Sequence, residues 1–296
     1  MKRSFIIGIL FWTIILFVVF LVALQTSNQL AQADSDTADT LTVIGNATPT
    51  LGSLTPNAPS LQENGNTASA TITAVVTDNN GYGEISAITA VFYDKGASQD
   101  NTCSANAQKC YTGITCTTSS CASLQCDVSC SVSLWHYTNA SSQWEWYIQA
   151  FDGTATGTAT SSAVTIDALT ALDVTEASIN YGTLSLGATS TEKSVTVSNT
   201  GNKNGLNTGI KESVAFACTV GSITSNASQG QHYSTTTSFA YSDGTVLATT
   251  TTTLATAIAQ GSDGTHAPSS LIYWLLVVPG SNVSGSCTGT DYFEAQ

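Results

Sequence analysis

Apolar and polar residues alternate along most of this chain, and a period of two predicts half-buried β-strands. One face of residues 70–77 carries Ala70, Ile72, Ala74 and Val76, and the other carries Thr71, Thr73 and Thr77. Residues 85–93, 128–134, 144–150 and 164–166 are also β-rich, and Asp78-Asn79-Asn80-Gly81 is a turn sequence. With residues 41–44 as a first strand, this part of the chain predicts about six or seven strands.

A second set of predicted strands begins at about residue 171. They are placed at residues 172–179, 194–198, 213–219, 233–241, 244–247, 271–278 and 288–294. The segment 271–278 is apolar on both faces, so we expect it to be central and covered on both sides. Beyond the N-terminal run there is no helical stripe, and short strands broken by Gly, Asn and Ser turns predict an all-β sandwich architecture.

The chain begins with two cations, Lys2 and Arg3, followed by a long apolar run at residues 5–24. About 20 apolar residues in a helix just span a hydrocarbon core, and the preceding cations favour a cytoplasmic N-terminus. Ala31-Gln32-Ala33 offers a signal-peptidase site, although the run is long and the site lies far beyond it. Residues 1–33 are therefore either a cleaved signal peptide or a retained helical anchor. A type IV pilin leader is a third interpretation, but its usual junction is absent.

The chain is acidic and sparsely charged. Asp and Glu number 20 against 7 Lys and Arg, only 9% of residues are charged, and no Arg occurs after Arg3. Removing Lys2 and Arg3 changes the net charge from −13 to −15. Nucleic acid is excluded as a natural partner because binding phosphates requires a basic patch. Hydrophobic residues make up 42% of the chain, which is enough for real cores. A surface of hydroxyls and amides suits an exposed wall or filament.

The even number of cysteines, 8, is first interpreted as disulfides in an exported chain. Six lie close together, at Cys103, Cys110, Cys116, Cys121, Cys126 and Cys130. Cys130 faces inward and is expected to tie this segment to the sandwich, but the sequence does not select among the pairings of the six. Zinc or redox chemistry is the alternative, without a Cys-x-x-Cys pair to support it. Strand parity favours a bond between Cys218 and Cys287, with two separate buried thiols as the alternative.

Two pairs of segments carry a resemblance. Residues 179–184 (INYGTL) with 195–202 (VTVSNTGN), and residues 74–78 (AVVTD) with 148–153 (IQAFDG), resemble parts of Ig-like modules of bacterial surface proteins. This likeness implies two tandem Ig-like β-sandwiches, at 34–167 and 168–296, and no catalytic residues. The Cys-rich insert at 95–127 departs from the Ig-like pattern.

Two groups of residues are candidate binding sites. Asp78, Asn80, Glu84 and Asp152 are oxygen donors that could converge on Ca²⁺, the only cofactor considered, although Asp-Asn-Asn-Gly also forms turns that cap their own backbone. Trp135, Tyr137 and Tyr147 have the opposite parity to inward residues. They could form an exposed aromatic platform for a sugar or a protein, or pack across strands under a loop.

No nucleophile, metalloprotease or phosphate-binding motif is present, although a pair of carboxylates in a glycosidase needs no local motif. We therefore expect a non-catalytic structural or adhesive protein of a microbial surface. Its expected partners are copies of itself, surface proteins or glycans, and the membrane through residues 5–24 if the leader is retained. Residues 34–47 are expected either to dock on their own domain or to add as a strand to a neighbour.

Overall fold

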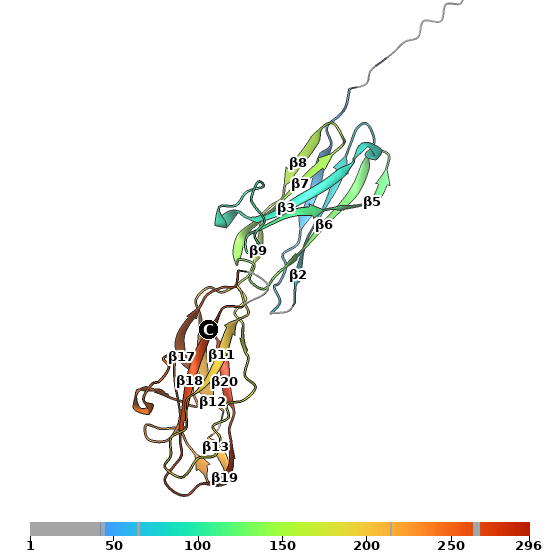
Figure 1. Ribbon diagram of the computed structural model, residues 1–296. Helices are drawn as coiled ribbons and strands as arrows, with labels where there is room; N and C mark the ends of the chain where they lie inside the picture. The colour runs from blue at the N-terminus through green and yellow to red at the C-terminus, as the bar shows by residue number, and fades with distance from the viewer. Residues whose placement is uncertain (1–41, 43–44, 64–65, 214, 263–266) are drawn as a thin grey trace, which may run out of the picture. The chain divides into compact units, whose positions relative to one another are not determined.

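The computed structural model describes residues 42, 45–63, 66–213, 215–262 and 267–296, of which Asn46–Gln296 form one compact unit (Figure 1). The described residues are all-β, as predicted, with antiparallel strands and three short 3₁₀ turns. None of their helices is long and apolar enough to cross a membrane. The leader with its apolar run, and the strand expected at 41–44 apart from Thr42, lie outside the described residues.

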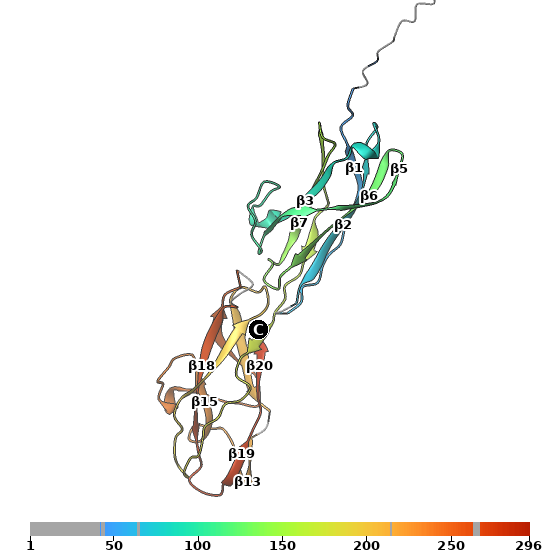
Figure 2. The ribbon, with the colours of Figure 1, turned by 45° about the vertical axis from the view of Figure 1, so that its right-hand side comes forward.

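The first group of strands forms two antiparallel sheets. One has the order β1-β2-β6-β5, and the other has the order β4-β3-β7-β8 with β9 also paired to β7. Their bounds are β1 Thr50–Pro56, β2 Ala68–Thr77, β3 Ala87–Asp94, β4 Cys110–Thr115, β5 Thr117–Ala122, β6 Gln125–Leu134, β7 Ser141–Phe151, β8 Thr156–Thr160 and β9 Val164–Ile166. Figures 1 and 2 show β2 beside β6 and β3 beside β7.

These two sheets pack on one shared core. Ile72 of β2 and Leu134 of β6 contribute from one sheet, and Phe92 of β3 and Trp146 of β7 from the other, all fully buried. The ring of Phe92 lies 4.7 Å from those of both Trp144 and Trp146, measured between ring centroids. Buried positions alternate with more exposed ones along β2 and, from Trp144 onward, along β7. This alternation presents the buried side chains to one side, which is the arrangement of a β-sandwich.

The second group forms three sheets. Their orders are β10-β11-β18-β15-β16, β17-β12-β20 and β14-β13-β19. The strands are β10 Leu172–Val174, β11 Lys193–Asn199, β12 Leu206–Glu212, β13 Phe216–Val220, β14 Ser222–Ile223, β15 Gly230–Ser234, β16 Thr245–Val246, β17 Thr252–Ile258, β18 Ser269–Val277, β19 Ser284–Thr288 and β20 Asp291–Ala295.

The apolar segment expected to be central is β18, which pairs with β11 on one side and β15 on the other. Its Trp274 is fully buried in a core that contains Val197 of β11, Tyr233 of β15 and Ile210 of β12. A smaller cluster of Ile223, Leu276 and Val283 lies toward β13 and β19, which run side by side in Figure 2.

Several expected boundaries differ from the observed ones. The strand expected at 213–219 begins only at Phe216, as β13. The strand expected at 288–294 coincides with the last residue of β19, Thr288, and with most of β20. The strand expected at 233–241 ends at Ser234, and 172–179 is a strand only to Val174. The Cys-rich insert is not a separate loop, because β4 pairs with β3 and β5 pairs with β6.

Candidate functional site

All eight cysteines form disulfides in the structure. The pairs are Cys103–Cys110, Cys116–Cys130, Cys121–Cys126 and Cys218–Cys287. Four such bonds fit an oxidising, extracellular environment, because cytosolic thiols are kept reduced.

Three bonds brace the Cys-rich segment, and one of them joins it to the core of the first group of strands. Cys130 is fully buried on β6, and its bond to Cys116 holds the residue that precedes β5 against that core. Cys121–Cys126 closes the turn between β5 and β6, and Cys103–Cys110 fixes the loop before β4. The insert therefore adds one strand to each sheet and is braced at both.

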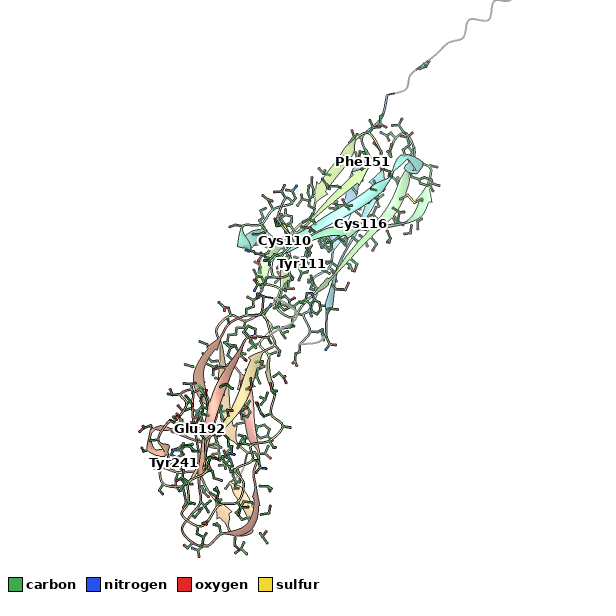
Figure 3. All side chains as sticks on the ribbon, in the orientation of Figure 1. Cys110, Tyr111, Cys116, Phe151, Glu192 and Tyr241 are labelled. Atoms are coloured by element: carbon green, nitrogen blue, oxygen red, sulfur yellow. A yellow bond between two sulfur atoms is a disulfide. The ribbon has the colours of Figure 1, made fainter. Side chains whose placement is uncertain are left out.

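A first groove, about 350 Å³ in volume, lies beside this braced segment. Its lining includes Ala107, Cys110, Tyr111, Val132 and Trp135. Figure 3 labels Cys110 and Tyr111 of this lining. The Tyr111 hydroxyl donates to the carbonyl of Ala107 at 2.6 Å, and burial raises the pKa of Tyr111 to about 12. Tyr111 is thus a fixed, neutral wall of this groove at any physiological pH.

The three aromatic residues of the expected platform have different environments. Trp135 is 37% exposed, Tyr137 is only 2% exposed, and Tyr147 is half-buried. The rings of Trp135 and Tyr137 are nearly parallel, with a 6.1 Å separation of centroids and an interplanar angle of 4°. The open aromatic face is therefore that of Trp135, and Tyr137 supports it from behind.

Two of the oxygen donors considered for Ca²⁺, Asp78 and Asp152, accept from backbone amides of their own turns, and Asn80 Oδ1 accepts from the amide of Ala47. Asp78 Oδ1 accepts from the Asn80 amide at 2.9 Å, and Asp152 Oδ1 accepts from the amides of Thr154 and Ala155 at 2.7 Å. The hydrogen bonds that Asp152 accepts from the Ala155 amide, the Asn46 side chain and the Thr154 amide lower its pKa. Glu84 is exposed. Within the described ranges, no group of three or more His, Cys, Asp and Glu side chains could hold a metal.

A second and larger groove, about 830 Å³ in volume, lies among the strands of the second group. Consecutive residues of two segments form its walls, 178–184 on one side and 284–287 of β19 on the other. Its floor is the small apolar cluster of Ile223, Leu276 and Val283. No charged residue lines this groove, and its lining mixes apolar side chains with Ser, Asn and Thr, so it suits an uncharged occupant.

The second core contains a buried polar cluster that the sequence did not predict. Glu212 at the end of β12 lies directly opposite Asp291 at the start of β20, and Glu212 is only 3% exposed. Gln231, fully buried on β15, donates from Nε2 to Asp291 Oδ2 and to the Tyr181 hydroxyl, each at 3.0 Å. Desolvation raises the pKa of both acids, and Asp291 raises that of Glu212 further.

Three oxygens of this cluster, Glu212 Oε1, Asp291 Oδ1 and Gln231 Oε1, are buried without a hydrogen-bond partner among the described residues. The only available sequence signal was the parity of Glu212 with the inward residues Thr208 and Ile210. That signal depends on knowing that β12 ends at Glu212.

Comparison with known proteins adds no family assignment, because no family model and no curated protein sequence matches this chain.

Proposed function

We propose that this protein is a non-catalytic structural element of a microbial cell surface, built from two tandem Ig-like β-sandwiches and assembling with copies of itself. The observation that carries the proposal is the combination of an all-β scaffold with four disulfides in the described residues. Such bonds are typical of exported proteins that must persist outside the cell.

The surface chemistry supports the same proposal. Only 9% of the residues are charged, so hydroxyl and amide groups must provide most of the polar surface. Neither groove contains a carboxylate among its lining residues, whereas a glycosidase needs two carboxylates flanking a bound sugar. The buried pair Glu212 and Asp291 belongs to the core and lines neither groove.

Electron microscopy of the secreted or detached protein tests this proposal. We expect the purified chain to form filaments or two-dimensional arrays, and the repeat distance of these assemblies should equal the dimension of one copy of the chain. Reduction with dithiothreitol followed by alkylation serves as the control, because the assemblies should lose order when the scaffold loses its bonds. Particles that stay monomeric at millimolar concentration would contradict the proposal.

A monomeric glycan- or protein-binding adhesin is the second candidate, and the exposed face of Trp135 beside the smaller groove favours it. A flat indole backed by a parallel tyrosine ring is a surface on which a sugar ring can lie.

The adhesin hypothesis predicts a specific loss of binding. Trp135→Ala should weaken binding to a responsive glycan roughly tenfold or more, because truncating a central aromatic anchor costs about 2 kcal/mol. Phe151→Ala is the matched control, since Phe151 is similarly exposed at 40% and does not line the groove. A glycan array followed by calorimetry makes the measurement. Equal effects of the two substitutions, or no glycan bound by the unaltered chain, would count against this candidate.

A further inference from the structure

One wall of the larger groove is β19, whose second edge pairs with no strand among the described residues. β19 pairs with β13 on one side only, because the sheet order is β14-β13-β19. Cys218 of β13 and Cys287 of β19 lie directly opposite each other. The backbone amide of Cys218 donates to the carbonyl of Gly221 and therefore points away from β19. This is a non-hydrogen-bonded pair of an antiparallel ladder, so the backbone N–H and C=O of Cys287 point to the free edge of β19.

The other lining segment, residues 178–184, is irregular chain that pairs with no strand of the described residues. Between Ser178 and Leu184, the only backbone amide that donates to another described residue is that of Gly182, which bonds to the Asn180 side chain. This segment and β19 line the same uncharged groove, and Leu186, which also lines it, is 55% exposed. An unpaired edge beside an uncharged groove with an apolar floor is an arrangement that can accept an added β-strand.

We propose that this groove binds residues 41–44 of a second copy of the chain as an added strand along β19. The inference rests on the proposed self-assembly and names the surface that would carry it. Residues 41–44 read Leu-Thr-Val-Ile, and no charged residue occurs from Thr40 to Gln62, which matches a groove without charged lining residues. Their β-branched side chains favour an extended conformation.

Length and position agree with this assignment. At about 3.4 Å per residue, a strand of residues 41–44 would be roughly 14 Å long and β19 is roughly 17 Å long, so the added strand would cover most of β19. The edge position next to β2 in the first group of strands is occupied by β1 at Thr50–Pro56. Asn46 bonds to Asp152 and the Ala47 amide to Asn80, so the donated segment directly precedes a fixed point of its own chain.

Site-directed cross-linking tests the inference in the full chain. All eight native cysteines are bonded, so introduced thiols are the reactive ones. A Val43→Cys chain is mixed with a Ser286→Cys chain and treated with a short bis-maleimide. We expect at least about tenfold more covalent heterodimer than from the matched control, because a bound neighbour raises the local thiol concentration to about the millimolar range. The control pairs Val43→Cys with Ser242→Cys, an exposed serine that does not line the groove.

The outcomes separate this inference from the proposed function. Heterodimer at the level of the Ser242→Cys control overturns the strand donation, and filaments in the same preparation would leave the proposed function standing. A cross-link that forms only within one chain of a Val43→Cys, Ser286→Cys double variant also overturns donation between copies. Absence of both cross-links and assemblies contradicts the two proposals together.

Discussion

Replacing both Cys218 and Cys287 by alanine is expected to lower the free energy of unfolding by about 4 kcal/mol, because this disulfide closes a long loop. The two residues are 69 positions apart, and the bond joins β13 to β19 within the second group of strands. The chain-entropy estimate attributes the effect to the denatured state, which gains conformational freedom when the loop is opened. Both side chains are half-buried, so the loss of packing adds little to the loop term.

The matched control is the double alanine variant of Cys121 and Cys126, which are only 5 positions apart. The same estimate gives about 2 kcal/mol for so short a loop. Urea unfolding monitored by tryptophan fluorescence measures both variants against the unaltered chain. The prediction would be contradicted if the free energy of unfolding fell less in the Cys218 and Cys287 variant than in the control variant. Local strain or residual structure, rather than loop length, would then determine how much these bonds stabilise the chain.

The strands with a strong local hydrophobic pattern were predicted from the sequence, and the same pattern explains which of their side chains are buried. β2 and β7 alternate strictly, and β18 is apolar on both faces, so the hydrophobic effect alone assigns their faces and their central positions. β1 has no such pattern: its sequence TLGSLTP contains a glycine and a proline, and only pairing with β2 makes it a strand. Tertiary context of this kind is not visible in a local window.

The grooves were also beyond local patterns. The larger one is lined by residues 284–287 of β19, whereas the sequence predicted a strand that begins only at residue 288. Trp135 was identified by its parity, whereas burial of its neighbour Tyr137 depends on the packing around it. The six clustered cysteines showed that the segment is braced, but their pairing depends on the registers of β4, β5 and β6, which no spacing encodes.

Glu212→Gln is expected to stabilise the chain near neutral pH, because the substitution removes one of two carboxylates that face each other in the second core. Glu212 and Asp291 are direct partners across β12 and β20, and Gln231 and Tyr181 are the polar groups that reach them from other segments. The nearest cation in sequence, Lys211, is paired with Glu294 instead. A glutamine amide could donate to Asp291 Oδ1, which has no described partner. Satisfying such a group contributes about 1–3 kcal/mol.

The pH dependence has a defined sign. Burial raises the pKa of both Glu212 and Asp291 in the folded state. A folded protein with raised carboxyl pKa values binds protons more readily than the unfolded chain, so its stability rises as pH falls from neutral through those values. One proton shared between Glu212 Oε1 and Asp291 Oδ1 would satisfy both oxygens. We therefore expect the melting temperature of the unaltered chain to increase on mild acidification, and Glu212→Gln to remove most of that increase.

Glu294→Gln is the matched control, because Glu294 lies on β20 with Asp291 but has the opposite electrostatic environment. Its hydrogen bonds to Lys211 and Thr251 lower the pKa of Glu294, so its contribution is present at neutral pH and is lost as the pH falls. Glu294→Gln should thus destabilise slightly at neutral pH and leave the acid-induced increase in place. Melting curves of the three proteins between pH 4 and pH 8, the range across which carboxyl groups with raised pKa values titrate, separate these effects. A Glu212→Gln chain that is less stable than the unaltered protein at pH 8 would show that the buried pair is held by a compensating interaction, such as a bound cation, instead of a shared proton.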